Sequence, residues 1–232
     1  MLLLGHRGSP RAFTENTLAG FTHALESGLD GIETDIQHTR DGSFVVHHDD
    51  HLPNGKRISA LMLSEIQTEF PEMMSLEALL EWSAFQDGMT LNLELKNEHN
   101  INDGRERHMV SILGKVLPKD SPLRQKLVIS SFNPLSLWRI VQLDRSYALG
   151  LLYDDTSIPK SVLWTSLRLL PLYSIHPHHT LLSYSTLRWA HHKNLKVFTW
   201  TVNDATKVTR YARWGVDGVI GDDPVALHAG RF

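Results

Sequence analysis

Eight short apolar runs recur along this chain, and stretches with helical periodicity separate most of them. The runs have the length of strands and cover Leu2–Gly5, Gly31–Ile36, Leu91–Leu95, Leu127–Ser130, Ala148–Leu152, Leu172–Ile175, Val197–Thr201 and Asp217–Ile220. Strands that alternate with helices form parallel sheets, because a parallel connection needs a crossover of about a dozen residues. In 232 residues, the most economical arrangement of eight such units is one closed (β/α)₈ barrel.

The segments between the runs predict the helices. Apolar residues fall on one face of a first helix at Leu18, Phe21, Ala24 and Leu25, and Gly28 stands where that helix would end. Further helices are expected after Ser75, through 112–116, from Pro134, and over 159–169, 184–193, 204–213 and 224–229. No repeat, linker or charge block divides the chain, so residues 1–232 are predicted to form a single domain.

An open doubly wound sheet is the alternative α/β architecture. Such a sheet usually carries a glycine-rich phosphate loop after its first strand. Here the first strand is followed by His6, Arg7 and Gly8 and then a long loop, with no such motif. The pattern therefore favours the barrel.

One apolar segment interrupts the alternation. Ser43–His47 follows the second run too closely for a parallel crossover. The Asp-Gly pair at 41–42 is a strong signal for a two-residue turn, so residues 31–48 are predicted to form a β-hairpin. A two-residue turn would place Asp35 opposite His48, whereas a turn of three or four residues would shift this register by one or two positions.

Composition excludes several classes of protein. The absence of cysteine excludes disulfides, zinc–thiolate sites, iron–sulfur clusters and cysteine nucleophiles. The net charge of −3 and the lack of a basic stripe argue against nucleic acid as a partner. No apolar run approaches the roughly 18 residues that span a bilayer, and the run at Met1–Leu4 is too short for a signal peptide. We therefore expect a cytoplasmic protein without stable membrane association, and the oligomeric state stays open.

The predicted strands end in unusually polar residues, and in a barrel these ends converge on one mouth. Glu33 and Asp35 share one face of a strand, as do Glu94 and Lys96. Three converging carboxylates repel one another unless a cation lies between them, and oxygen ligands suit Mg²⁺, Ca²⁺ or Mn²⁺. The alternative is a structural ion network in which these acids pair with Arg7 and Lys96.

Two histidines at the predicted mouth form a candidate acid–base pair. His6 and His48 follow strands, and imidazole is the side chain that titrates near neutrality. One could take a proton from a nucleophile while the other gives a proton to a leaving group. Arg7 and Lys96 would supply positive charge to an anionic substrate, most simply a phosphate. The roles of His176 and His178 are undecided between substrate contact and loop packing.

In this order, the residues resemble the glycerophosphodiester phosphodiesterase family. The matching motifs are His6–Gly8, Glu15–Thr17, Gly31–Ile36, Thr39–Gly42, Val45–Asp49, Leu93–Lys96, Ser130–Phe132, Thr199–Asn203 and Asp217–Ile220. Each motif is weak alone, but the ordered set is specific and spans nearly the whole chain. The resemblance implies a (β/α)₈ barrel of the phospholipase-C-like phosphodiesterase type.

The resemblance also implies a reaction and a site. The reaction is hydrolysis of glycerophosphodiesters to glycerol 3-phosphate and an alcohol, with one divalent cation, Mg²⁺ or Ca²⁺. Carried over residue by residue, it assigns acid–base catalysis to His6 and His48, the cation to Glu33, Asp35 and Glu94, phosphate binding to Arg7 and Lys96, a pocket wall to Trp200, and support to Glu15 and Asn16. Which histidine is the acid stays open, as does the choice between direct attack by water and a cyclic phosphate intermediate.

The sequence departs from the family pattern at three places. Thr14 stands where the family usually has proline, and Gly221 stands where it usually has threonine. The segment between His48 and Glu94 is short, so we expect an abbreviated cap from residues 50–74 and a fairly open site.

Three other functions compete with this interpretation. A phospholipase of the related barrel type would need access to a bilayer, and the chain offers only a modest apolar stretch at Trp164, Leu167, Leu169 and Leu170, whose periodicity favours a core helix. A phosphate-binding module without activity would be expected to lack a histidine or a carboxylate of the set. An amidohydrolase would need His-x-His after the first strand, where this chain has His6-Arg7-Gly8.

Overall fold

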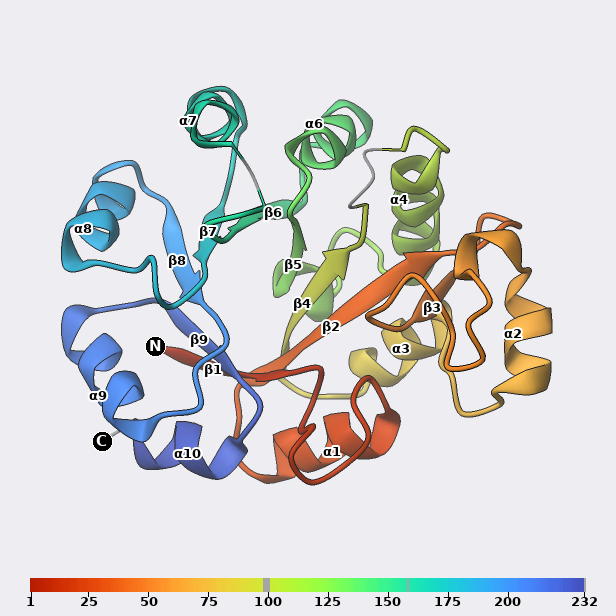
Figure 1. Ribbon diagram of the computed structural model, residues 1–232, viewed down its shortest axis with the longest axis horizontal. Coiled ribbons are helices and arrows are strands. Elements are labelled where there is room, and N and C mark those ends of the chain that lie inside the picture. The colour runs from red at the N-terminus through yellow and green to blue at the C-terminus, as the bar shows by residue number, and fades with distance from the viewer. Residues whose placement is uncertain (98–100, 158, 232) are drawn as a thin grey trace.

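The computed structural model describes residues 1–97, 101–157 and 159–231, and its strands form one closed barrel (Figure 1). The strands are β1 (Leu2–His6), β2 (Gly31–His38), β3 (Phe44–Val46), β4 (Thr90–Leu95), β5 (Leu127–Ser131), β6 (Ala148–Tyr153), β7 (Ser174–Pro177), β8 (Lys196–Thr199) and β9 (Gly218–Gly221). Their order is β1-β9-β8-β7-β6-β5-β4-β2, and pairing of β1 with β2 closes the ring. The predicted (β/α)₈ barrel and all eight of its predicted strands are confirmed, with ends shifted by two residues or fewer.

Helices surround the barrel as the periodicity predicted. They are α1 (Leu18–Glu26), α2 (Leu63–Glu69), α3 (Leu76–Ala84), α4 (Arg105–Val116), α5 (Pro122–Gln125), α6 (Pro134–Leu143), α7 (Lys160–Leu169), α8 (Tyr184–His192), α9 (Ala205–Trp214) and α10 (Pro224–Ala229). The predicted cap at Ser75 is confirmed, since its hydroxyl accepts a hydrogen bond from the Ala78 amide at 3.1 Å. The short helices α2 and α5 were not predicted. No helix in the described part of the chain is long and apolar enough to cross a bilayer.

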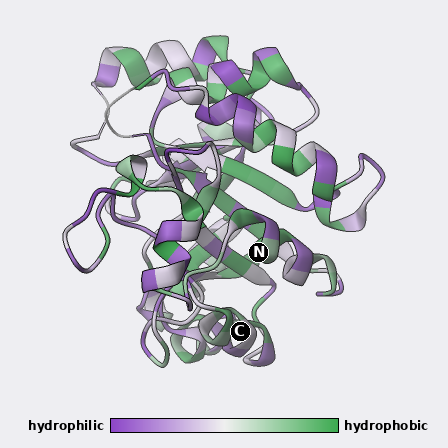
Figure 2. Ribbon diagram, turned by 90° about the vertical axis from the view of Figure 1, so that its right-hand side faces the viewer, coloured by the Kyte–Doolittle hydropathy of each residue, from purple (hydrophilic) through white to green (hydrophobic). Residues whose placement is uncertain are grey.

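Strand alternation separates two sets of apolar side chains. Leu91, Leu93 and Leu95 point outward from β4 into the main core beneath the helices, as predicted. A smaller set, with Leu4 and Phe198, fills the inside of the barrel. Figure 2 shows hydrophilic and hydrophobic residues mixed along the helices, as expected for helices that pack one face on a core.

The hairpin at residues 31–48 is present as β2 and β3, but its predicted register was wrong by one residue. Ile36 pairs with Val46, and the backbone of Asp35 accepts a hydrogen bond from the His47 amide, so Asp35 lies opposite His47 and not His48. The turn contains three residues instead of two, with Gly42 in the left-handed region at φ +82°. His48 therefore follows the end of β3.

Residues 50–74 form the predicted short cap. The segment contains a single turn of 3₁₀ helix (Ile58–Ala60) followed by α2. Leu52, Ile58 and Ile66 are buried together with Val45 of β3 in a cluster of their own. This cluster attaches the cap to the hairpin, beside the carboxyl ends of the barrel strands.

Candidate active site

Three carboxylates meet at the mouth of the barrel, as predicted. Glu33 and Asp35 come from β2, and Glu94 comes from β4, where it pairs in register with Asp35. One oxygen of each carboxylate lies within 4.8 Å of the others, and all three side chains are buried. Period-two alternation on two adjacent strands is sufficient to bring these groups to one point.

Two cations contact this carboxylate triad. The Lys96 ammonium lies 3.1 Å from Asp35 and 2.8 Å from Glu94, and it is itself almost fully buried. The Arg7 guanidinium lies 3.3 Å from Asp35, and it pairs with Glu15 at 3.1 Å. The backbone amide of Arg7 also donates to Glu33 at 3.1 Å. Asp35 is thus the best neutralised of the three acids.

The electrostatics of the triad follow from this uneven pairing. Burial, together with the charges of Asp35 and Glu94, raises the pKa of Glu33 to about 8. Burial also raises the pKa of Glu94. Burial acts in the same direction on Asp35, but Lys96 and its other cationic neighbours outweigh it and hold the pKa of Asp35 at about 2. With all three carboxylates ionised, the triad would hold one more negative charge than its two cationic partners, and the raised pKa values of Glu33 and Glu94 oppose this excess.

An oxygen-only donor set with excess negative charge suits a hard divalent cation. Mg²⁺ and Ca²⁺ take carboxylate oxygens, and the spacing of the triad lets all three residues contribute one ligand atom. A bound cation would also stabilise the ionised forms of Glu33 and Glu94, whose pKa values burial raises. The residues present therefore fit the group that the sequence predicted.

His6 lies at the end of β1, level with Glu33 in the sheet register. Its Nδ1 atom lies 2.6 Å from an Asp222 oxygen, and its Nε2 atom lies 3.9 Å from Glu33. Burial lowers the pKa of His6, but the hydrogen bond with Asp222 and the charge of Glu33 outweigh this effect and raise it. The ring is thus oriented with Nε2 towards the carboxylate triad.

Asp222 is a residue that the sequence reasoning did not assign to the site. It follows β9, and Asn203 holds it in place by donating to its carboxylate at 2.6 Å and accepting from its amide at 2.7 Å. Its position after the last strand was a usable signal, because every strand end faces the mouth. Gly221 precedes it where a Cβ would lie 2.2 Å from the Val202 carbonyl oxygen, so this close approach requires glycine.

His48 reaches the site from the segment after β3. Gln37 donates to its carbonyl oxygen at 2.8 Å, and its Nδ1 atom lies 2.7 Å from Asp49. Its side chain is 31% exposed, compared with 18% for His6. The charge of His48 lowers the pKa of both Asp35 and Glu94, so the ring lies within electrostatic reach of the triad.

Asn16 and Glu15 were both expected to support the metal side of the site, and of the two Asn16 contacts a carboxylate of the triad. The Asn16 amide donates to Asp35 at 3.2 Å and accepts a hydrogen bond from Thr34 at 2.8 Å. Glu15 pairs with Arg7. Both contacts lie on the Asp35 side of the triad.

Trp200 lies at the opposite part of the mouth, after β8. Its indole nitrogen donates to the His176 carbonyl oxygen at 2.8 Å, and its ring packs edge-on against Phe132 and His178. The structure places the two undecided histidines differently. The His176 ring is fully buried inside the barrel, where burial lowers its pKa to about 3, whereas His178 packs against Trp200.

Comparison with known proteins agrees with the fold and the residues at the mouth. Residues 6–226 match the model of the glycerophosphoryl diester phosphodiesterase family, so the chain belongs to this family. A glycerophosphodiester phosphodiesterase of Caldanaerobacter subterraneus is 30% identical, over 97% of this chain and 96% of its own length. The family and its named relatives identify the activity as that of a phosphoric diester hydrolase acting on glycerophosphodiesters.

Solved structures show the same architecture over the whole chain. The glycerophosphodiester phosphodiesterase of Thermotoga maritima superposes with a TM-score of 0.79 at 26% identity, covering 97% of this chain and 95% of its own. A phosphodiesterase of Oleispira antarctica superposes with a TM-score of 0.85 at 26% identity, covering 99% and 96%. The Oleispira structure is a complex with the product sn-glycerol-3-phosphate.

Proposed function

We propose that this protein hydrolyses glycerophosphodiesters to glycerol 3-phosphate and an alcohol in a reaction that depends on a divalent cation and on two histidines. The observation that carries the proposal is the buried triad of Glu33, Asp35 and Glu94, with His6 oriented towards it by Asp222. The product found in the Oleispira enzyme supports the same substrate class.

The triad would hold one Mg²⁺ or Ca²⁺ ion. Such an ion supplies Lewis-acid polarisation of a phosphoryl oxygen and lowers the pKa of a bound hydroxyl or water. The protein's part is to present three oxygen ligands at one buried point, and Asn16 helps by fixing the Asp35 carboxylate.

Arg7 and Lys96 would bind the phosphate. Both cations face Asp35 within 3.3 Å, so both already lie beside the triad. A phosphate next to the triad would accept hydrogen bonds from the guanidinium and the ammonium, which stabilise charge on the phosphoryl oxygens. Trp200 would form a wall for the organic part of the substrate.

His6 and His48 would exchange protons with the substrate, one taking a proton and the other donating one to the departing alcohol. Because Nδ1 of His6 is committed to Asp222, Nε2 is the atom available to the substrate. The bond of His48 to Asp49 similarly commits its Nδ1 atom. A cytoplasmic location stays a prediction.

The test is release of glycerol 3-phosphate from glycerophosphocholine and glycerophosphoethanolamine, with Mg²⁺, with Ca²⁺ and with EDTA. We expect release that EDTA abolishes and one of the two ions restores. Release that is unaffected by EDTA would contradict the role of the triad. No release by folded protein with either ion would contradict the proposed substrates.

A further inference from the structure

An apolar groove of about 850 Å³ runs between α6 and α7, which stand apart on the outside of β6 (Figure 1). Trp138 of α6 and Val162 and Leu169 of α7 line it and remain 52%, 41% and 76% exposed. Among the described lining residues, Asp154 is the one with a charged side chain. The groove thus leaves apolar surface open to solvent in a place where neighbouring barrel helices usually pack together.

One end of the groove adjoins the mouth of the barrel. Asn97 and Phe132 line its upper end, and they directly follow Lys96 of the site and Ser131 of β5. The Phe132 ring packs edge-on against Trp200, with 5.5 Å between the ring centroids. Phe132 therefore borders both the groove and Trp200 at the mouth.

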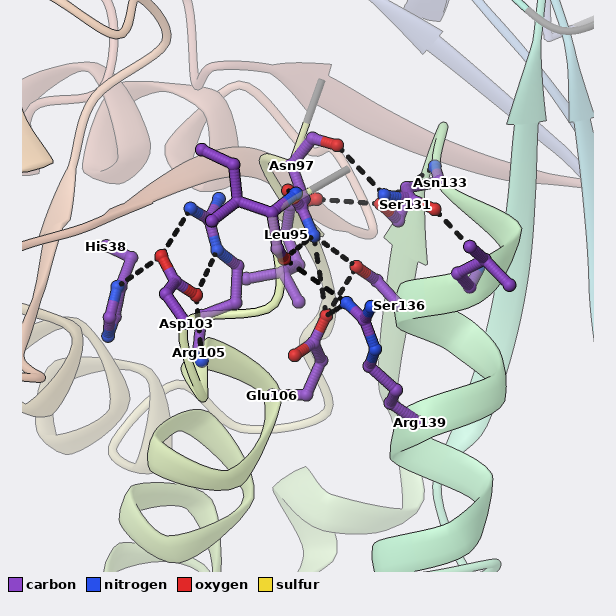
Figure 3. A network of polar contacts seen from close by, with 12 residues as sticks. His38, Leu95, Asn97, Asp103, Arg105, Glu106, Ser131, Asn133, Ser136 and Arg139 are labelled. Carbon is purple, nitrogen blue, oxygen red and sulfur yellow. Dashed lines mark hydrogen bonds and ion pairs between the residues drawn. The ribbon is translucent and has the colours of Figure 1, made fainter. Parts of the chain in front are cut away.

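A polar network holds this upper end in place (Figure 3). The Asn97 amide donates to Ser136 at 2.8 Å, and the Asn133 amide donates to the Asn97 carbonyl oxygen at 3.0 Å. Ser136 in turn donates to Glu106, which pairs with Arg139. The Asn97 and Asn133 amides therefore already have hydrogen-bond partners within the protein. A ligand in the groove would contact mainly its apolar side chains.

Helix α7 has more apolar surface than its packing uses. The prediction of a core helix is confirmed for Leu167 and Leu170, which pack with Leu163 against the main core, and is wrong for Trp164 and Leu169, which are 51% and 76% exposed. Leu169 points away from that core and lines the groove, and Leu170 borders both. Packing on the core accounts for one apolar face of α7 and leaves the second face, with Leu169, without a partner among the described residues. A ligand bound in the groove would cover this second face.

We propose that this groove binds a single alkyl chain carried by the departing alcohol of the substrate. The proposal rests on the proposed function and names the substrate class: glycerophosphodiesters whose alcohol bears a long hydrocarbon chain. Glycerol phosphate is polar along its whole length and suits the charged mouth, so the chain belongs on the other side of phosphorus. In the net reaction the bond from phosphorus to the alcohol oxygen breaks, the oxygen of water ends on phosphorus, and the alcohol takes a proton.

The test compares two substrates that differ only in chain length, sn-glycero-3-phosphoethanol and sn-glycero-3-phosphododecanol, at concentrations below micelle formation. We expect kcat/KM for the dodecyl ester to exceed that for the ethyl ester by about tenfold or more, because each methylene removed from water favours binding. Thr165→Trp places an indole in the groove from an exposed position, and the ratio should fall towards one. Arg168→Trp adds the same indole to α7 outside the groove, and the ratio should stay at the wild-type value.

The outcomes separate this inference from the proposed function. Cleavage of the ethyl ester with no preference for the dodecyl ester overturns the inference and leaves the proposed function standing. Cleavage of neither ester overturns both. A preference for the dodecyl ester that persists in Thr165→Trp would mean that the alkyl chain binds elsewhere, and it would overturn the assignment of the chain to the groove. A stronger preference for a dodecanoyl chain on the glycerol of glycerophosphocholine puts the chain on the wrong side of phosphorus and also overturns the inference.

Discussion

The two halves of the barrel mouth are built from opposite kinds of side chain. The half formed by β1, β2 and β4 buries ionisable groups, among them Glu33, Asp35 and Lys96. The half formed by β6, β7 and β8 is lined by neutral and aromatic groups such as His176 and Trp200. Both halves occupy equivalent places in the same sheet, so the architecture alone does not decide which residues they carry.

The difference follows from what each half must do. Burying a charge costs folding free energy unless a partner of opposite charge is present. In the proposed function, a cation and a phosphate are the partners of the charged half. The neutral half has no such requirement and can stabilise the barrel by packing. We therefore expect changes in the charged half to act mainly on activity, and changes at a packing residue of the neutral half, such as His176, to act mainly on stability.

The largest effect is expected at the carboxylate triad. Glu94→Gln keeps the shape of the side chain but removes a charge that the cation needs, and turnover should fall by about 10³-fold or more, because a metal ion contributes several kcal/mol to transition-state stabilisation. The same variant should lose the rise in melting temperature that Mg²⁺ or Ca²⁺ gives the wild type. Glu81→Gln, at an exposed position on α3, is the matched control. Full activity in Glu94→Gln would contradict the proposal that the charged half binds a cation required for the reaction.

The next effect is expected at the two histidines. His6→Ala or His48→Ala should lower kcat by about 10²–10⁴-fold, the range of a general acid or base, while circular dichroism shows a folded protein. His192→Ala removes an exposed histidine from α8 and should keep the wild-type rate. Wild-type rates in both site variants would show that the charged half binds ligand without proton transfer by imidazole.

A smaller effect is expected where the charged half is positioned by a residue from the last strand. Asp222→Asn should lower kcat by about tenfold to a hundredfold, because it weakens a charge-assisted hydrogen bond to His6. KM and the melting temperature should change little. Asp223→Asn is a close control, since Asp223 caps α10 and asparagine caps equally well. A rise in KM with unchanged kcat would mean that Asp222 contributes to substrate binding and not to the orientation of His6.

These contacts show what a sequence can predict and where it fails. Glu33, Asp35 and Glu94 were predictable because alternation fixes the face of a strand and parallel strands end at one edge. Asp222 was missed because its contact with His6 joins the two ends of the chain, and it exists only after β9 pairs with β1. The rule that finds strands does not say which distant side chains meet.

The hairpin failed for a local reason. The Asp-Gly pair correctly indicated a turn, but Gly42 adopts its left-handed conformation in a turn of three residues. The extra residue shifts the register, so that Asp35 lies opposite His47 instead of His48. The groove was beyond prediction because the exposure of Leu169 depends on the spacing between α6 and α7. That spacing is set by tertiary packing, which periodicity does not contain.

The smallest expected effect tests the neutral half. Burial lowers the pKa of His176 to about 3, whereas the unfolded chain binds this proton near pH 6.5. Stability from the neutral ring is therefore complete above about pH 6.5 and is lost as the pH falls below it, by about 2 kcal/mol between pH 7 and pH 5. His176→Gln cannot take this proton, so its unfolding free energy should depend less steeply on pH over this range.

Urea denaturation of the wild type and of His176→Gln at pH 7, 6 and 5 measures this difference. His192→Gln, at an exposed position, should keep the wild-type pH dependence and so controls for the loss of a histidine as such. Parallel stability curves for the wild type and His176→Gln would mean that His176 is charged inside the barrel. The two halves of the mouth would then both bury charge. The distinction between a half built for chemistry and a half built for packing would fail, because a ring whose Nε2 atom contacts, among the described polar groups, only the Ser174 hydroxyl is tolerated in the interior as a neutral group.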